Sequence, residues 1–301
     1  MGKVTRLKGD LDDVDALLEI ISVIKDVATN RFFTFAQRKA NFQKFFEVFM
    51  DFFQIVQNIE TECPLLRNDN KGVTLFIVSS DQAFMAQLNS RLTSLALQQS
   101  EKNPGAAIAC LGKRVAEKLR AVGLTNIEKI FTTDQYPDRY TLSLAIREYL
   151  VSRIMEGHAG KVILIHLWAK NFTIVKPRIL TLLPASELIR TGGGDITEED
   201  GQEMDGQSRE DKYKLLLESP PDKIMKALAD IWIHSRLFEL LSDILLVEAA
   251  IQAQQLESAM ESLGSEKKGL LVSFRKAGRD EMNKAMREVF TQSGVAKGGR
   301  R

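Results

Sequence analysis

The stretch that decides the fold is Val73-Thr74-Leu75-Phe76-Ile77-Val78-Ser79-Ser80, a short and nearly continuous apolar run. A strand with one face in water alternates apolar and polar residues, whereas a strand buried on both faces is apolar throughout. The run therefore predicts a strand inside a sheet that is covered on both sides.

Working outward, strands alternate with helices over residues 72–190. Helices are expected at 81–99, 113–121 and 140–155, and strands at 106–111, 126–132, 161–168 and 177–183. This alternation implies right-handed crossovers and a mainly parallel sheet. Residues 72–190 are therefore predicted to form a Rossmann-like α/β domain.

Both flanks of this domain show the three-to-four-residue apolar rhythm of a long helix. In residues 1–62 the stripe comprises Leu7, Leu11, Val14, Leu18 and Ile21, and a phenylalanine cluster from Phe32 to Phe53 continues it with Phe35, Phe42, Phe46 and Phe49. In residues 213–301 it comprises Ile224, Leu228, Ile231, Ser235, Phe238, Ser242, Leu245, Ala249, Gln252, Leu256, Ala259 and Leu263. Neither helix would be stable without a partner for its stripe. We predict an α/β fold in which a long antiparallel coiled coil of the two terminal helices carries the inserted domain.

Smaller features complete this organisation. Residues 191–212 are acidic and glycine-rich and are expected to form a flexible loop, because they hold too little apolar area to order themselves. The phenylalanine cluster is expected to be coiled-coil core rather than an exposed docking face. Gly264, Gly269 and Gly278 each weaken the second helix by about 1 kcal/mol relative to alanine and are candidate bends.

Composition excludes several classes of function. Lys plus Arg, 41, nearly balances Asp plus Glu, 40, so no strong field attracts nucleic acid or an anionic membrane. No apolar run approaches the roughly 18 residues of a membrane span, and no direct membrane insertion is expected. Cys63 and Cys110 lie in no metal-ligand or redox spacing and are expected to be reduced, buried thiols.

Motifs of catalysis and cofactor binding are missing from the sequence. Around Gly160-Lys161, Met155 and Val162 stand where a phosphate-binding loop needs glycine and a hydroxyl residue, and there is no GxGxxG pattern. The three histidines fit no zinc spacing, and His166 is expected to be a hydrogen-bonded core residue. Ser79-Ser80-Asp81 lacks the GxSxG elbow. We predict no catalytic, cofactor-binding or metal site.

Three local stretches, in this order and with this architecture, resemble the gamma subunit of F-type ATP synthases. Residues 78–89, VSSDQAFMAQLN, resemble the family's VSSDRGLCGGLN; residues 25–31, KDVATNR, resemble KMVAASK; and residues 274–279, FRKAGR, resemble YNKARQ. The residues shared in the first stretch include Ser79, Ser80, Asp81, Leu88 and Asn89. One departure is the acidic run Asp10, Asp12, Asp13 and Asp15, where the family's first helix is strongly basic. The chain is thus similar to a divergent member of that family.

The resemblance implies a non-catalytic central-stalk rotor subunit that couples ion-driven rotation of a membrane ring to conformational change at catalytic sites. The implied partners are three alpha and three beta subunits, the epsilon subunit and the membrane c-ring, with no cofactor and no nucleic acid. The coupling ion is left open between proton and sodium. The implied location is peripheral, on the cytoplasmic side of a bacterial inner membrane.

The resemblance also implies contact residues. Phe274, Arg275, Lys276 and Arg279, with Lys25 and Arg31, are candidates for contact with the surrounding ring, the alternative being a solvated helix face. Ser80, Asp81 and Asn89 are expected to build the turn after the first strand, with Asp81 capping the next helix, rather than to contact a partner.

Two rival interpretations stay open at this level. One is a free-standing coiled-coil scaffold with an inserted α/β domain, which would form a homodimer without ATPase subunits. The other is an enzyme that binds a nucleotide or a small acid at the strand carboxyl ends, although the glycine-rich loops that this needs are missing.

Overall fold

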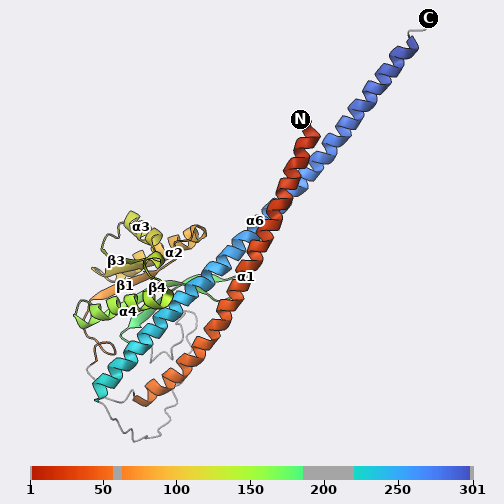
Figure 1. Ribbon diagram of the computed structural model, residues 1–301. Coiled ribbons are helices and arrows are strands. Elements are labelled where there is room, and N and C mark those ends of the chain that lie inside the picture. The colour runs from red at the N-terminus through yellow and green to blue at the C-terminus, as the bar shows by residue number, and fades with distance from the viewer. Residues whose placement is uncertain (1, 57–62, 186–219, 299–301) are drawn as a thin grey trace. The chain divides into compact units, whose positions relative to one another are not determined.

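The computed structural model describes residues 2–56, 63–185 and 220–298 (Figure 1). The predicted acidic loop, residues 191–212, lies outside them. The chain divides into two compact units, one of residues 1–29 with 252–301 and one of residues 30–251. Each is described in turn, and the sequence-based domain boundaries stay predictions.

The unit of residues 30–251 is built on a five-stranded sheet in the order β3-β2-β1-β4-β5. The strands are β1 (Val73–Val78), β2 (Ala107–Leu111), β3 (Ile127–Phe131), β4 (Lys161–Ala169) and β5 (Val175–Leu183). Neighbours from β3 to β4 are parallel, and β5 runs antiparallel to β4. The apolar run at 73–78 is therefore the central strand, as predicted. The reversal at β5 follows from its connection, residues 170–174, which is too short for a crossover.

Helices cover both faces of this sheet (Figure 1). A single 3-10 turn, η1 (Ala83–Met85), leads into α2 (Ala86–Lys102), which lies with α3 (Lys113–Ala121) on one face. The turn η2 (Thr133–Gln135) precedes α4 (Arg139–Met155), which packs on the other face. Right-handed crossovers of this kind follow from parallel strands joined by helices, and the predicted Rossmann-like arrangement is confirmed.

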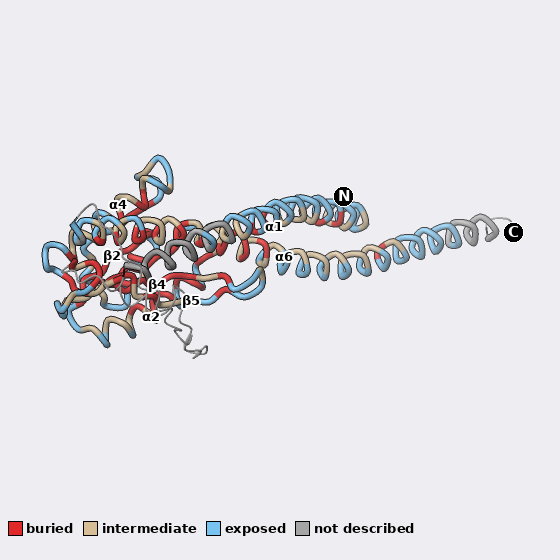
Figure 2. The backbone as a smooth tube through the Cα atoms, turned by 90° about the horizontal axis from the view of Figure 1, so that it is seen from below, coloured by how far each residue is buried: buried red, intermediate tan, exposed pale blue. Residues whose placement is uncertain are grey.

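The pleat of β1 sends alternate side chains to two cores. Phe76 and Val78 join α4 and residues 225–241 of the last helix, whereas Leu75 and Ile77 join α2, α3 and residues 246–250 of that helix. The inner strands β1, β2 and β4 are almost wholly buried, and Figure 2 shows buried backbone around β4. A strand with both faces in cores needs a continuous apolar sequence such as that of residues 73–78.

Two long helices contribute to these cores, α1 (Lys3–Val56) and α6 (Pro221–Gly298). Phe32 of α1 is only 6% exposed and meets Phe172 of the β4–β5 connection edge to face, with ring centroids 5.1 Å apart. Phe33 is 60% exposed. The prediction of a uniform coiled-coil phenylalanine core is therefore wrong at these two positions, because the β4–β5 hairpin covers one ring and leaves its neighbour in solvent. The side chains of Phe42, Phe46, Phe49 and Phe53 lie outside those that the structure describes.

In the other unit, residues 3–29 of α1 pair with α6 from residue 252 to about residue 281, where Glu281 lies beside Gly2 at the start of the chain. Ion pairs join Asp15 to Lys267 at 2.5 Å and Lys25 to Glu257 at 2.7 Å. The residue number of the α6 partner falls as the residue number on α1 rises. The two helices are therefore antiparallel, as predicted. The buried seam contains Leu11, Val14 and Ala28 of α1 and Ala253 and Ala277 of α6. Small residues on α6 let the two backbones approach closely.

The glycines of α6 interrupt no hydrogen-bonded turn, since the helix is continuous through Gly264, Gly269 and Gly278. A Cβ at any of the three would find no atom within 4 Å. Their role as bends stays a prediction. Among the described ranges, no helix combines the length and the apolarity that crossing a bilayer needs.

Candidate functional site

The turn after β1 is held by a buried polar network built from Ser79, Ser80 and Asn89. The Ser79 hydroxyl donates to Asn89 Oδ1, and Asn89 Nδ2 donates to the Ser80 carbonyl at 3.1 Å. Asn89, on α2, is fully buried. A buried amide without partners would cost about 1–3 kcal/mol, so these bonds fix the turn against the helix that follows it. The structural role predicted for Ser80 and Asn89 agrees with this geometry.

Ser80 also connects the turn to the long helix α6. Its hydroxyl donates to Glu248 Oε1 and accepts a bond from the Gln82 backbone N–H at 3.2 Å. Burial raises the pKa of Glu248, and the Ser80 hydrogen bond opposes that rise. No local pattern marks Glu248, because it stands 168 positions from its partner.

Asp81 caps a helix, but not the one predicted. Its carboxylate accepts the backbone N–H groups of Lys113 at 3.0 Å and Arg114 at 2.9 Å, both in the first turn of α3. The next helical element, η1, starts after Gln82 without a side-chain cap. The correction has a topological reason: β1 and β2 are adjacent and parallel, so the loop after β1 lies beside the loop after β2, where α3 begins.

This cap fills the position where doubly wound folds bind phosphate. Such folds hold anions at helix N-termini beyond the carboxyl ends of the strands. Here Gly112, with φ of 111°, precedes α3, and a Cβ at Gly112 would lie 3.2 Å from Asp81 Oδ1. The chain therefore places its own carboxylate against the free N–H groups. The described residues also hold no cluster of three or more side chains suited to a metal ion.

Two of the predicted ring contacts, Lys25 and Arg31, lie on α1. Lys25 is engaged within the chain: its ammonium donates to Glu257 of α6, and that hydrogen bond raises its pKa. Its structural role is to hold the two helices in register. Arg31 is exposed. Contact of either residue with a partner stays a prediction.

The other four predicted contacts lie on one stretch of α6. Arg275, Lys276 and Arg279 are exposed, Phe274 is half-buried, and Ala277 between them is buried in the helix pair. The exposed cations form one basic row and are far along the chain from the Ser80–Asp81–Asn89 turn. The predicted residues thus form three separate groups rather than one site, and whether the basic row meets a partner stays a prediction.

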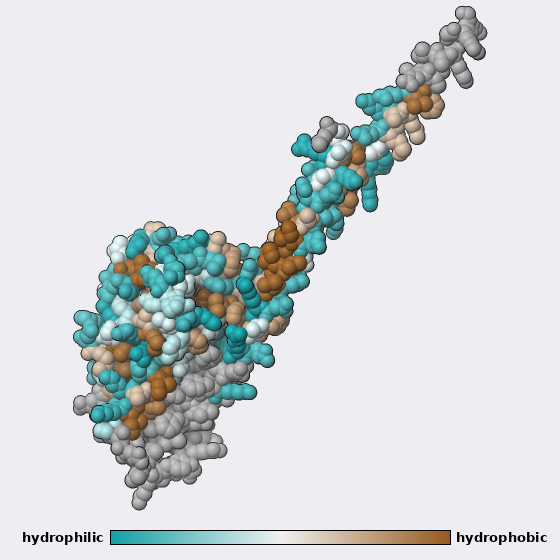
Figure 3. All heavy atoms as spheres, viewed as in Figure 1, coloured by the Kyte–Doolittle hydropathy of each residue, from teal (hydrophilic) through white to brown (hydrophobic). Residues whose placement is uncertain are grey.

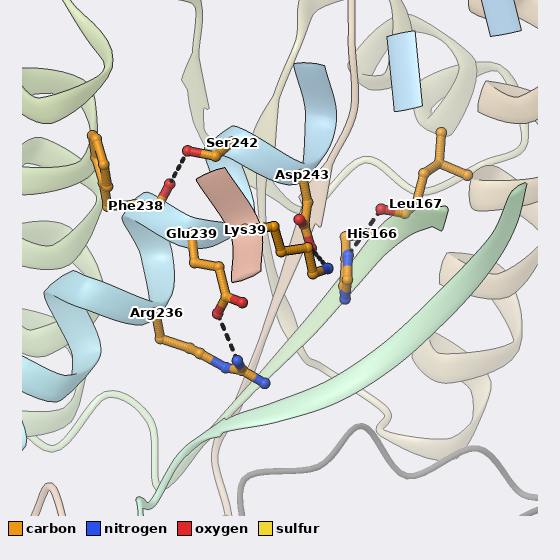
Figure 4. A network of polar contacts seen from close by, with 8 residues as sticks. All are labelled: Lys39, His166, Leu167, Arg236, Phe238, Glu239, Ser242 and Asp243. Atoms are coloured by element: carbon orange, nitrogen blue, oxygen red, sulfur yellow. Dashed lines mark hydrogen bonds and ion pairs between the residues drawn. The ribbon is translucent and has the colours of Figure 1, made fainter. Parts of the chain in front are cut away.

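A buried charged cluster was missed by sequence reasoning (Figure 4). Lys39 of α1 pairs with Asp243 of α6 at 2.7 Å, and Arg236 pairs with Glu239 at 2.6 Å. His166 of β4 lies beside them, donating from Nδ1 to the Leu167 carbonyl at 3.1 Å. Burial lowers the pKa of His166 to about 3, and the nearby cations act in the same direction. The imidazole is therefore neutral at physiological pH, and its predicted place in the core is confirmed.

Comparison with known proteins gives one consistent family. The model of the ATP synthase family matches residues 3–291. Curated relatives include the chloroplastic ATP synthase gamma chain of Phaeodactylum tricornutum, 25% identical over 260 residues and covering 81% of this chain and 70% of that protein. Another is the ATP synthase gamma chain of Halothermothrix orenii, 22% identical over 227 residues and covering 75% of this chain and 74% of its own length.

Solved structures show the same fold. A chain of the Euglena gracilis mitochondrial ATP synthase, in a structure of its OSCP, F1 and c-ring, superposes with a TM-score of 0.60 at 14% identity, covering 99% of this chain and 96% of that chain. A chain of the Tetrahymena thermophila central stalk and c-ring gives 0.57 at 15% identity, covering 80% and 99%. Because the family model spans both long helices and the whole sheet, the chain belongs to the ATP synthase gamma-chain family.

Proposed function

We propose that this chain is the central-stalk rotor subunit, gamma, of a rotary F-type ATP synthase. Its helix pair would couple rotation of an ion-driven membrane ring to conformational change at the catalytic sites of alpha and beta subunits. The observation that carries this proposal is the family match over residues 3–291, which takes in the helices and the sheet as one unit.

A rotating shaft can change the conformation of its neighbours only if its sides make different contacts. A partner changes conformation only when the free energy of contact differs between its conformations. The helix pair of residues 3–29 and 252–281 meets this requirement. On α1 the exposed side chains include Ile20 and Ile24, whereas on α6 they include the cations Arg275, Lys276 and Arg279. Rotation would therefore present apolar and basic surfaces to each catalytic site in turn.

Transmission of torque needs the helices to be fixed to the α/β unit. Within residues 30–251, α6 contributes Glu248 to the Ser80 turn and Asp243 to the ion pair with Lys39 of α1. Apolar side chains of α6 between Met225 and Leu241 lie in the core on one sheet face. Pulling the helix from this unit would expose apolar area and separate buried charges, which costs several kcal/mol.

The partners in this proposal are three alpha and three beta subunits around the helix pair, with the epsilon subunit and the c-ring. The complex would be peripheral on the cytoplasmic side of a bacterial inner membrane. The gamma chain has no catalytic role of its own in this scheme. The Asp81 carboxylate supports that view, since it occupies the helix N-terminus at which a nucleotide phosphate would bind.

A pull-down of the tagged chain from its native membranes, followed by quantitative mass spectrometry, tests the proposal. The expected result is recovery of alpha and beta ATPase subunits at about three per copy of this chain, as a threefold ring around one shaft requires. Recovery of the chain alone, or only with itself, would overturn the rotor assignment and favour the scaffold.

A further inference from the structure

A histidine is buried in the sheet of the unit of residues 30–251 without a full set of hydrogen bonds. Hydrophilic residues cover much of the outside of this unit (Figure 3), so a buried polar group is the informative exception. His166 of β4 is only 3% exposed. Its Nδ1 donates to the Leu167 carbonyl, so Nε2 carries the lone pair of the neutral ring. Among the residues that the structure describes, Nε2 has no hydrogen-bond partner, and this ring therefore needs an explanation beyond packing.

Three cations from three different elements surround this imidazole. They are Lys39 of α1, Arg236 of α6 and Arg178 of β5, and each disfavours a positive charge on the ring. Arg178 stands beside His166 in the strand register, and Figure 4 shows Lys39 close to the ring. On its other side β4 pairs with β1, where the neighbour of His166 is the apolar Val78. The neutral imidazole therefore fits its surroundings, whereas a protonated imidazole does not.

The two carboxylates of this cluster are already engaged with two of these cations (Figure 4). Asp243 accepts from the Lys39 ammonium at 2.7 Å. Glu239 accepts from the Arg236 guanidinium at 2.6 Å. Both carboxylates are buried, so their ion pairs are costly to separate. A proton on Nε2 would either draw a carboxylate away from its cation or stay uncompensated among three positive charges, and either outcome weakens the packing of α1 and α6 against β4 and β5.

We propose that His166 forms an acid-sensitive contact: when its imidazole gains a proton, the segments of α1 and α6 around Lys39 and Asp243 separate from strands β4 and β5. The described charged groups that face the ring from these elements are the three cations and the two carboxylates named above. No ring subunit takes part in this contact, so it goes beyond the proposed rotor function and its test does not depend on that function.

The sign of the pH dependence follows from burial. Desolvation lowers the pKa of His166 from its ordinary value of 6.5 to about 3, and the three cations act in the same direction. When the contact opens, the imidazole meets water and regains its ordinary pKa. The open form therefore takes up the proton at a higher pH than the closed form, and the closed form loses stability as the pH falls from about 6.5 towards 3.

Glu239 titrates in the opposite sense. Burial raises the pKa of its carboxyl group, although the Arg236 guanidinium opposes the rise. The closed form therefore holds this proton more tightly than the open form, and the associated stability is lost as the pH rises through the folded pKa. Acid thus weakens the contact through His166 and strengthens it through Glu239, so a variant that lacks one of the two groups is needed to separate them.

Amide hydrogen exchange of the isolated full chain at pH 7 and pH 5 tests the proposal, with rates corrected for the intrinsic effect of pH on exchange. For His166 alone, a pKa of about 3 in the closed form against 6.5 in the open form raises the opening constant about 25-fold between these two pH values. The loss of protection is expected in β5 and in residues 236–243 of α6, and not in the inner strand β2. An equal loss in all strands would mean global unfolding and would overturn the proposal.

Two histidine variants show which group is responsible. His166→Gln keeps a neutral side chain that cannot be protonated, so β5 should be at least as well protected at pH 5 as at pH 7. The matched control His158→Gln changes a histidine whose side chain is 58% exposed and should keep the loss of about 25-fold. Each ratio is taken within one variant, so a uniform change in stability cancels. If His166→Gln lost protection as the unmodified chain does, His166 would not be the titrating group.

Lys39→Gln tests the surrounding charges. It removes one cation and frees Asp243 to accept from a protonated imidazole, which raises the pKa of His166 in the closed form. The ratio between pH 5 and pH 7 should therefore fall below about tenfold, and an unchanged or larger ratio would refute the role of the cluster.

A last measurement needs no variant, because the chain has only three histidines. The imidazole ¹⁵N chemical shifts should show His166 with an unprotonated Nε2 in the closed form at pH 5. A His166 ring that is protonated at pH 5 while β5 stays protected would overturn the proposal.

Discussion

Replacing Asp81 tests the topology of its cap most directly. Asp81→Ala removes both acceptors from the backbone N–H groups of Lys113 and Arg114. Losing a side-chain cap costs about 0.5–2 kcal/mol, and losing a negative charge at a helix N-terminus costs about 0.3–1 kcal/mol. We expect a local destabilisation of α3 of about 2 kcal/mol. Asp81→Asn keeps one of the two acceptors and loses the other together with the charge, so a smaller cost of about 1 kcal/mol is expected.

Amide hydrogen exchange measures this destabilisation within α3 itself, because individual helices open locally and each has its own free energy of opening. In Asp81→Ala the amides of α3 should exchange about 30-fold faster, and in Asp81→Asn about three- to fivefold faster. The control is Asp134→Ala. Asp134 pairs with the Lys113 ammonium at 3.0 Å, but both side chains are more than half exposed, so its loss should change exchange little.

The result that would refute the reasoning is specific. If Asp81→Ala left α3 unchanged and accelerated exchange in η1 and α2, Asp81 would cap the helix that follows it in sequence. If Asp81→Asn exchanged like the unmodified chain, the carboxylate charge would contribute nothing, and the account of the filled anion position would be wrong.

Three further predictions concern the unit of residues 30–251. Asp243→Asn leaves the Lys39 ammonium without its charged partner in a largely buried site and should cost about 3 kcal/mol in chemical denaturation; no change would mean that the pair is solvated. Burial raises the pKa of Glu248, so the folded chain binds that proton more tightly than the unfolded chain, and the associated stability is lost as pH rises through the folded pKa. Glu248→Gln should therefore flatten the fall of Tm with rising pH without lowering Tm at neutral pH, whereas a lower Tm at every pH would contradict this. Phe32→Ala should cost about 3–4 kcal/mol and Phe33→Ala less than about 1, given their 6% and 60% exposure; equal costs would refute the assignment of Phe32 to the core.

Sequence reasoning succeeded where one physical constraint governs a whole segment. The apolar run at 73–78 had to be a central strand, and the apolar line through Leu11 and Val14 had to face another helix. One pattern is a continuous apolar run and the other a periodic stripe, and both are local, so they can be interpreted without knowing which element lies opposite. The antiparallel pairing followed because each stripe needed the other.

The errors arose where the partner is distant in sequence. Asp81 contacts residues 32 and 33 positions away, and Ser80 contacts Glu248 across 168 positions. Only strand order decides which loops become neighbours, and strand order is not encoded in any local pattern. The ion pair Lys39–Asp243 joins opposite ends of the chain for the same reason. Four of the candidate ring contacts, Arg31, Arg275, Lys276 and Arg279, are exposed, and folding alone does not constrain exposed residues.

The pairing of the first helix with the last also sets the order of events during synthesis. Lys25 meets Glu257 across 232 positions, and ribosomes add about 5–20 residues each second. Helix α1 therefore emerges roughly ten to fifty seconds before the segment that covers its seam. During that interval its apolar residues have no native partner from this chain. A chaperone or an assembly partner that covers this stripe during synthesis should therefore raise the yield of folded subunit.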